Sequence, residues 1–287
     1  MRVYKLFYLK INMKNKNILI YEILEKIKQN KKYSSISDDI IKKLINYHLN
    51  SNPRITQSDK ETIKELRAKL HKLYSSFQTK KKRKKENYLE ELKQNPNSIE
   101  RTKKLLSITL STKERVNDYE QLYKNIFFIT SKPKILLDVG AGLNPLSFPL
   151  MNLQKLIYYA YDINIEDKNF LNKYFQIMKS FGLNGKAEIL DITNLKSIKK
   201  LPQSDLIFLF KIIDIIPTKK LAEQILLILI KKTNFIIVSF PTKTITRKQM
   251  NNPKRKWFEL MLERNNLVYK IIEISNEIFY IINYPSY

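Results

Sequence analysis

The sequence predicts an α/β fold: a mainly parallel sheet covered by helices, ending in an antiparallel hairpin and preceded by a helical region. Three observations predict it. Short apolar segments alternate with helical ones after residue 133, two strand-like segments follow each other near the C-terminus, and two of the four glycines directly follow the first apolar segment. Apolar strands that alternate with helices are typical of a parallel sheet buried on both faces. At 287 residues the chain is long enough for such a core and a further domain.

The first 133 residues contain no glycine and read as helices. Apolar residues recur at helical spacing in three segments, residues 17–29, 37–49 and 58–77. Ser37 is the expected N-cap of the second helix, and the third helix is expected to begin at Ser58. We therefore divide the chain into a basic helical domain, residues 1–130, and a sheet-forming domain, residues 131–287.

Five short apolar strands are expected in the second domain, at residues 134–139, 155–163, 187–190, 205–210 and 234–240. Helical segments separate them, among them residues 166–181 and 219–232. The last two strands, residues 267–274 and 277–284, have only two residues between them and predict a hairpin. Five parallel strands followed by a hairpin form the Rossmann-like outline of class I S-adenosylmethionine-dependent methyltransferases, rather than that of a plain dinucleotide-binding fold.

The first strand runs into the segment LLDVGAGLNP, whose two glycines, Gly140 and Gly142, are separated by one residue. Glycines at a strand end adopt positive φ and let the backbone approach a ligand closely, and this edge of a doubly wound sheet is where ligands bind. The spacing is D-x-G-x-G, not G-x-G-x-x-G, so it does not favour a dinucleotide. It suits S-adenosylmethionine, whose ammonium group would attract the carboxylate of Asp138.

Acidic residues also follow the second and third strands. Asp162 ends the second strand, where a carboxylate can accept both ribose hydroxyls, and Asp191 with Ile192 follows the third, where the pair can hold adenine. Each acid alone could equally be a helix cap or a loop residue. Because three acids occur at three successive strand ends, we favour the interpretation that they bind the cofactor.

The chain is strongly basic, with 53 lysines and arginines against 27 acidic residues and a formal charge of +26. Residues 1–133 hold 31 of these cations and only 14 of the acids. Codon bias explains part of the lysine count but not the shortage of acids, so a polyanion such as nucleic acid is the expected partner. A run of six cations begins at Lys80, and four of them are candidate RNA contacts: Lys80, Lys81, Lys82 and Arg83. A solvated loop is the alternative for this run.

Several classes of site are excluded by what the sequence lacks. It has no cysteine, which rules out disulfides, thiolate zinc sites and cysteine nucleophiles, and its two histidines are too few for a histidine metal site. No apolar run approaches the roughly 18 residues that a membrane span needs, and the N-terminus lacks the pattern of a signal peptide. We expect a cytoplasmic protein without metal. Met13 is an alternative start, which would make residues 1–12 an upstream extension.

Several blocks carry a resemblance to a known family. They are KLH at 69–71, STKERV at 111–116, LLDVGAGLNPLSFPLM at 136–151, FLFKIID at 208–214, VSFPTKTI at 238–245 and WFE at 257–259. Through them the sequence resembles the small-subunit (16S) rRNA guanine-N7 methyltransferases that confer aminoglycoside resistance, over most of residues 65–285. D-x-G-x-G is generic to methyltransferases, whereas S-T-x-E-R before it and S-F-P-x-K after it are fairly specific.

The resemblance implies that Arg115 contacts the methionine carboxylate of S-adenosylmethionine. It implies the same positions as above for Asp138, Gly140 and Gly142 at the amino-acid end, Asp162 at the ribose, and Asp191 and Ile192 at adenine. The other positions that it places at the cofactor are Phe77, Thr109, Leu110, Ser111, Ala141, Ile163, Phe210 and Lys219. The chain also departs from the family: Thr109 replaces a histidine, Ala141 a cysteine and Asp214 a proline, and Lys219 aligns near a glutamine. The departures leave the details of the cofactor lid and of the target-base pocket open.

The residues that the sequence lacks limit which atom of the RNA can accept the methyl group. Methylation of pyrimidine C5 needs a cysteine, and methylation of exocyclic amines usually needs a Pro-Pro-aromatic loop where this chain has LFKIID. Guanine N7 needs neither, so no residue is assigned as a general base. Lys211 is either an RNA contact, which we favour, or the base of a 2′-hydroxyl transfer. Arg247, Lys248 and Met250, in the loop after the fifth strand, are candidates for holding a flipped base.

Together these observations predict a monomeric enzyme that methylates guanine N7 of 16S rRNA in the assembled small ribosomal subunit, with aminoglycoside resistance or ribosome maturation as its role. One alternative is an rRNA or tRNA methyltransferase with a different acceptor, a 2′-hydroxyl or a base amine. Another is a basic RNA-binding protein with a vestigial methyltransferase fold. A methyltransferase of proteins or small molecules would not explain the charge of +26.

Overall fold

The computed structural model describes residues 16–73, 84–243, 248–250 and 253–285. The chain forms two compact units. The first consists of residues 1–76 and 163–165, and the second of residues 77–162 and 166–287. This division at residue 76 differs from the one at residue 130 expected from the sequence, because the helices after residue 84 pack into the second unit. Within the described residues, no helix is long and apolar enough to cross a membrane.

The first unit is helical, as predicted. It contains a helix over residues 16–28, α2 (Asp38–Ser51) and α3 (Lys60–Leu73), whose isoleucines and leucines form a buried core of their own. Ser37 is the N-cap residue of α2, although its side chain accepts no capping hydrogen bond.

The predicted start of the third helix at Ser58 is wrong, because α3 begins at Lys60. Asp59 satisfies its first turn by accepting a 2.7 Å hydrogen bond from the amide of Thr62. The Ser58 hydroxyl is instead bound by the ammonium of Lys26, 2.7 Å away.

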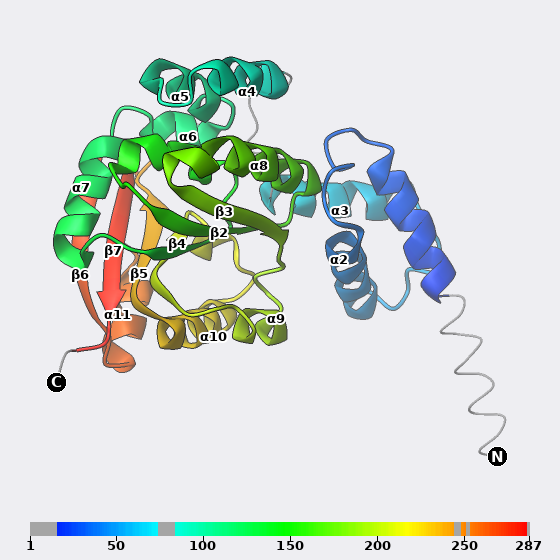
Figure 1. The fold of residues 1–287 in the computed structure, drawn as a ribbon. Helices are drawn as coiled ribbons and strands as arrows, with labels where there is room; N and C mark the ends of the chain where they lie inside the picture. The colour runs from blue at the N-terminus through cyan, green and yellow to red at the C-terminus, as the bar shows by residue number, and fades with distance from the viewer. Residues whose placement is uncertain (1–15, 74–83, 244–247, 251–252, 286–287) are drawn as a thin grey trace. The chain divides into compact units, whose positions relative to one another are not determined.

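The second unit contains a seven-stranded sheet in the order β3-β2-β1-β4-β5-β7-β6 (Figure 1). Its strands are β1 (Ile135–Val139), β2 (Leu156–Asp162), β3 (Leu183–Ile189), β4 (Ser204–Phe210), β5 (Thr233–Pro241), β6 (Val268–Ile274) and β7 (Glu277–Asn283). The first five pair in parallel, whereas β7 is antiparallel to both β5 and β6. The predicted class I methyltransferase fold, with its terminal hairpin, is therefore confirmed.

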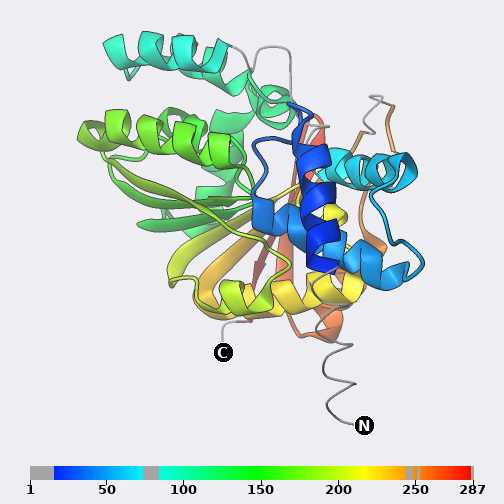
Figure 2. The same cartoon turned by 90° about the vertical axis from the view of Figure 1, so that its right-hand side faces the viewer.

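Helices cover both faces of this sheet (Figures 1 and 2). One face carries α4 (Lys85–Gln94), α5 (Ile99–Leu106), α6 (Leu110–Arg115), α7 (Tyr119–Thr130), the 3₁₀ helix η3 (Asn144–Met151) and α8 (Ile165–Met178). The other carries α9 (Leu195–Lys199), α10 (Lys219–Leu229) and α11 (Lys256–Arg264). Alternate residues of a strand point to opposite faces of the sheet. Phe208 therefore packs in the core under α7 and α8, and Ile207 in the core under α10. Short 3₁₀ helices also occur in this unit, among them η4 (Lys179–Phe181), η5 (Ile213–Ile215) and η6 (Ile230–Lys232).

Strand β3 begins four residues earlier than the segment 187–190 expected from the sequence. It is an edge strand, so Asn184 and Lys186 remain exposed and its first half lacks an apolar run. Gly185 lies between them because a Cβ there would come within 2.1 Å of the Phe175 ring of α8. Close helix packing, rather than a loop, explains this glycine.

Candidate functional site

The turn between β1 and η3 is built on two glycines with positive φ, +77° at Gly140 and +49° at Gly142. The amides of Gly140 and Ala141 both donate to the Tyr161 carbonyl, at 2.8 and 3.0 Å. The Gly142 amide donates to Oδ2 of Asp162 at 2.8 Å, which fastens the turn to the end of β2. A Cβ on Gly142 would meet no atom within 4 Å. The turn is thus held rigidly while its backbone at Gly142 stays open to an approaching group.

Asp138 lies in β1, two residues before Gly140, and is completely buried. The Tyr158 hydroxyl and the Asn144 amide donate to its Oδ2 at 2.7 and 2.8 Å. Its Oδ1 has no hydrogen-bond partner among the described residues. Burial raises the pKa of Asp138 to about 6, although these hydrogen bonds oppose the shift. A buried acceptor without a donor is costly to the fold, and the described residues supply no donor to Oδ1.

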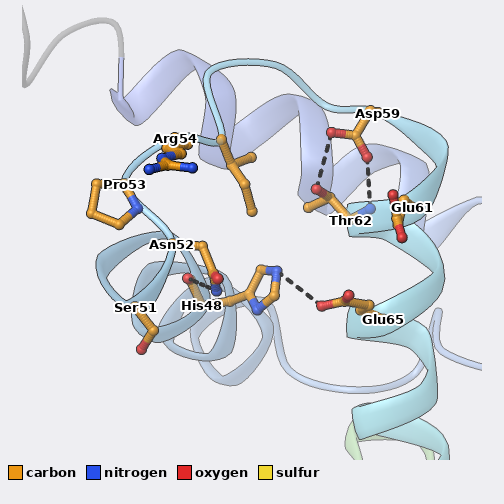
Figure 3. A pocket seen from close by; sticks show the side chains of 10 residues that line it. His48, Ser51, Asn52, Pro53, Arg54, Asp59, Glu61, Thr62 and Glu65 are labelled. Atoms are coloured by element: carbon orange, nitrogen blue, oxygen red, sulfur yellow. Dashed lines mark hydrogen bonds and ion pairs between the residues drawn. The ribbon is translucent and has the colours of Figure 1, made fainter.

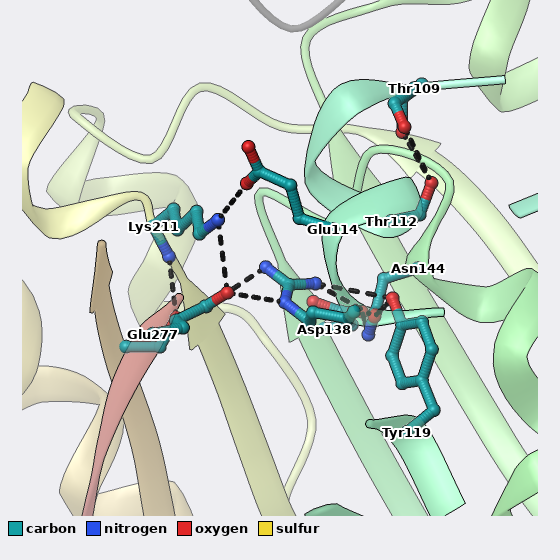
Figure 4. A network of polar contacts seen from close by, with 10 residues as sticks. Thr109, Thr112, Glu114, Tyr119, Asp138, Asn144, Lys211 and Glu277 are labelled. Atoms are coloured by element: carbon teal, nitrogen blue, oxygen red, sulfur yellow. Dashed lines mark hydrogen bonds and ion pairs between the residues drawn. The ribbon is translucent and has the colours of Figure 1, made fainter. Parts of the chain in front are cut away.

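A network of buried charges lies beside Asp138 (Figure 4). Arg115, at the end of α6, donates from Nε and Nη2 to the two carboxylate oxygens of Glu277 at 2.8 and 3.1 Å. Its Nη1 makes longer contacts with Asn144, at 3.3 Å, and with the Tyr119 hydroxyl, at 3.4 Å. The guanidinium also lies 4.9 Å from the ring centroid of Phe210. Two of the predicted cofactor residues, Arg115 and Phe210, are thereby brought together.

Lys211 joins the same network from the end of β4. Its Nζ lies 2.8 Å from Oε2 of Glu114 and 3.2 Å from Oε2 of Glu277, and its side chain is only 8% exposed. Its backbone has a φ of +56°, and its amide donates to the hydroxyl of Ser239 at 3.0 Å. The ammonium therefore lies between two carboxylates, an arrangement suited to a cation held in a fixed position.

Glu277 is the centre of this network and was missed by the sequence analysis. It is 1% exposed, accepts hydrogen bonds from Arg115 and the Ser239 hydroxyl and forms an ion pair with Lys211. Burial alone would raise the pKa of Glu277, but the cations of Arg115 and Lys211 hold it below its ordinary value. The feature of the sequence that could have indicated it is an acidic residue at the start of an otherwise apolar strand, β7. Glu114, also missed, lies within the STKERV block.

The other predicted acids lie at the ends of neighbouring strands, because the sheet order places β3, β2 and β1 side by side. Asp162 is the last residue of β2 and supports the glycine turn. Asp191 follows β3, and its Oδ1 accepts from the amide and hydroxyl of Thr193 at 2.8 and 2.6 Å. Ile192 is buried beside it. Asp191 is thus also a loop acid, and its contact with adenine remains a prediction.

The remaining candidates are placed as follows. Thr109 precedes α6 and is buried, with its hydroxyl 2.7 Å from that of Thr112. Leu110 and Ser111 are half-buried in the first turn of α6. Lys219 is exposed at the start of α10, with its Nζ 5.6 Å from the Trp257 ring centroid. Ile163 is part of the first unit. Lys248 is exposed and Met250 is half-buried in the loop after β5. Phe77, Lys80, Lys81, Lys82, Arg83 and Arg247 lie outside the described residues.

The first unit has a separate cavity of about 420 Å³ (Figure 3). Its lining mixes carboxylates with Arg54 and the buried His48. Nδ1 of His48 lies 3.0 Å from the ammonium of Lys69, and Nε2 lies 3.5 Å from Glu65. Burial lowers the pKa of His48, and Lys69 lowers it further. The cavity has neither a glycine turn nor strand-end acids, and among the described residues no acid and histidine cluster could hold a metal.

Comparison with known proteins gives consistent similarities. Residues 29–281 match the family described as ribosomal RNA methyltransferase (FmrO). A 16S rRNA (guanine(1405)-N(7))-methyltransferase of Proteus mirabilis is 26% identical, with 94% of this chain and 99% of that protein aligned. A protein with the same description from Frankia casuarinae is 20% identical over 91% of this chain and 92% of its own length.

Solved structures show the same fold. The 16S rRNA methyltransferase RmtF, crystallised with S-adenosyl-L-homocysteine, superposes with a TM-score of 0.76 at 19% identity, over 93% of this chain and 98% of that one. The 16S rRNA methylase RmtB gives a TM-score of 0.68 at 21% identity, over the same shares of the two chains.

Proposed function

The chain belongs to the ribosomal RNA methyltransferase (FmrO) family, and from this premise we propose that it transfers the methyl group of S-adenosylmethionine to N7 of a guanine in 16S rRNA. The relatives that match along nearly their whole length are named for N7 of guanine 1405, and this is the nucleotide we propose. The observation that carries the proposal is the unpartnered Oδ1 of buried Asp138 beside the open glycine turn.

The residues present fit the cofactor. Its ammonium group would supply the donor that Oδ1 of Asp138 lacks. The open backbone at Gly142 leaves room for the amino-acid end, and Asp162 lies on the adjacent strand end, where the ribose hydroxyls would bind. Nη1 of Arg115, engaged only at 3.3 and 3.4 Å, is the donor left for the methionine carboxylate. Asp191 and Ile192 complete the series at adenine.

Methyl transfer to guanine N7 requires mainly that the chain position the two reactants. When bound, the cofactor supplies a methyl group on a positively charged sulfur. N7 of guanine carries a free lone pair and no proton, so no residue of the chain would have to act as a base before attack. Lys211, held between Glu114 and Glu277, acts as a fixed cation at the site. Alignment and exclusion of water then provide the rate enhancement.

The substrate is the rRNA of the assembled small subunit, which a monomeric enzyme would approach in the cytoplasm. The support for this is electrostatic: residues 1–133 hold 31 of the 53 cations, and we propose that residues 1–130 form the main RNA-binding and lid region. Lys80, Lys81, Lys82 and Arg83 would contact phosphates, and Arg247, Lys248 and Met250 would hold the flipped guanine.

The product distinguishes the proposal from its rivals. 16S rRNA from cells with and without the protein is treated with borohydride and aniline and mapped by primer extension. N7 methylation leaves a cationic base, at which this treatment cleaves the RNA chain. We expect cleavage at guanine 1405, and we expect the cells with the protein to be resistant to aminoglycosides. An alkali-resistant, aniline-stable product would identify a 2′-hydroxyl transfer instead. Absence of any S-adenosylmethionine binding by calorimetry would identify an RNA-binding protein with a vestigial fold.

A further inference from the structure

The loop after β5 closes on itself at its base. The Met250 amide donates to the Thr242 carbonyl at 2.9 Å, and Lys243 and Gln249 form an antiparallel bridge. The Thr242 amide in turn donates to the Asn276 carbonyl, at 3.0 Å. These contacts give the base of the loop a defined path at the carboxyl end of the sheet, and this path carries Lys248 and Met250.

The guanidinium of Arg255, the last residue before α11, contacts residues at both ends of this loop. Nη1 donates to the Pro253 carbonyl at 2.6 Å, and Nη2 lies 3.4 Å from the Pro241 carbonyl and 3.9 Å from the Met250 sulfur. The group stands 5.2 Å from the Phe240 ring centroid. Both ends of the loop and its Met250 are therefore joined through one side chain.

The same guanidinium also reaches a second loop. Its Nη2 and Nε donate to Oδ2 of Asp214 at 2.7 and 3.2 Å. Asp214 lies in η5, three residues after Lys211. The ion pair therefore links the loop after β5 to the segment that begins with Lys211.

We propose that Asp214 and Arg255 form a clamp that positions the described base of the loop after β5, residues 241–243, 248–250 and 253, against the segment after β4, and so sets the geometry in which the rRNA base meets the methyl group. The inference rests on the function proposed above. Both are positioning residues, since the structure gives them no contact with Asp138, Arg115 or the glycine turn. An arginine–carboxylate pair with two donors fixes orientation as well as distance, and a loop ordered in advance binds its partner at lower entropic cost.

The test uses Asp214→Ala, Arg255→Ala and the double variant of the full chain, with small ribosomal subunits as substrate. We expect each single change to lower kcat/KM for the subunit by about 10- to 100-fold, the size of effect that small misplacements cause. The calorimetric Kd for S-adenosylmethionine should stay within about twofold of the wild type, because the clamp lies outside the cofactor residues. The double variant should lose little more than either single one, as expected for residues that act as a unit.

A matched control is available in the same unit. Arg264 donates to Glu223 at 2.7 Å, a similar ion pair that joins α11 to α10 and contacts neither loop. Glu223→Ala should leave kcat/KM unchanged, and Asp214→Glu, which keeps the charge, should recover most of the rate.

Three outcomes would overturn the clamp: unchanged kcat/KM in Asp214→Ala, losses that multiply in the double variant, or rates that simply follow the melting temperature across all variants, Glu223→Ala included. The failure of the proposed function would look different. In that case the wild-type protein itself would leave no aniline-sensitive site in the subunit.

Discussion

At the scale of single residues, the proposed function makes Asp138 a group that would link the stability of the fold to the binding of the cofactor. Its carboxyl group is buried, half satisfied and has its pKa raised to about 6. A raised carboxyl pKa means that the folded chain holds this proton more tightly than the unfolded chain does. The Asp138 contribution to the free energy of unfolding therefore decreases as pH rises from about 4 to 6. An ammonium group beside Oδ1 would stabilise the ionised form and remove this cost.

The corresponding prediction concerns affinity. Because the cofactor's ammonium favours ionised Asp138, we expect S-adenosylmethionine affinity to be nearly constant between about pH 6 and 7 and to fall below pH 6, as the carboxyl becomes protonated. Asp138→Asn should bind more weakly and without this acid limb. Calorimetry between pH 5 and 8 measures both. An acid limb that persists in Asp138→Asn would assign the titration to another group.

Lys211 allows a second prediction at this scale. If N7 is the acceptor, Lys211→Ala lowers the methylation rate through lost positioning, and the pH–rate profile keeps its shape. If Lys211 were a general base, its loss would cost about 10²–10⁴-fold and the wild-type rate would fall at low pH. Single-turnover rates on small subunits from pH 6 to 9 separate the two. The contacts of its ammonium with Glu114 and Glu277 favour the first outcome.

At the scale of elements, the sequence was most informative where one element is apolar along its whole length. The predicted first, second, fourth and fifth strands agree with β1, β2, β4 and β5 to within one residue at either end, because a strand buried on both faces must be an apolar run. Edge strand β3 is not apolar along its whole length, so only its second half was predicted. Helices α4 to α7 were expected as helical sequence without individual boundaries.

The charged network was beyond the reach of the sequence for a different reason. Arg115 and Glu277 are 162 residues apart, and nothing local in either segment indicates that they meet. The strand-end acids could be predicted because parallel strands bring their carboxyl ends to one edge. Partners from α6, β7 and the β4 end converge only once the sheet order is known, and so Glu114 and Glu277 were missed.

The packing of β3 gives a prediction for an element. Gly185→Val would place its Cβ within 2.1 Å of the Phe175 ring, so the strand or α8 must shift. Overpacking of this kind costs about 1–3 kcal/mol, which urea denaturation followed by circular dichroism would measure as a lower midpoint. Asn184→Val, on the exposed side of the same strand, is the matched control and should change stability little. Equal midpoints for the two variants would show that α8 can shift without a loss of stability.

At the scale of the whole molecule, the formal charge of +26 is the property that the sheet and its site do not explain. A cofactor pocket for one small ligand needs only a few charged groups, and those in the described network nearly balance one another. The excess cations concentrate in the first part of the chain, so their role is to be sought in the approach to RNA. Each phosphate that a cation neutralises releases counterions, and the salt dependence of binding counts these contacts.

The last prediction uses that count. Changing Lys80, Lys81, Lys82 and Arg83 to alanine should weaken binding to the small subunit and flatten the slope of log K against log salt. With about 0.7–0.9 released counterions per contact, the loss of four contacts should change the slope by up to about 3.6. The control removes the same charge elsewhere, by changing Lys196, Lys199, Lys200 and Lys231, four exposed lysines of the second unit. If the run contacts phosphates, only the first variant changes the slope strongly, because overall charge is equal in the two. Identical slopes in both variants would leave the run as a solvated segment and place the RNA contacts elsewhere on the chain.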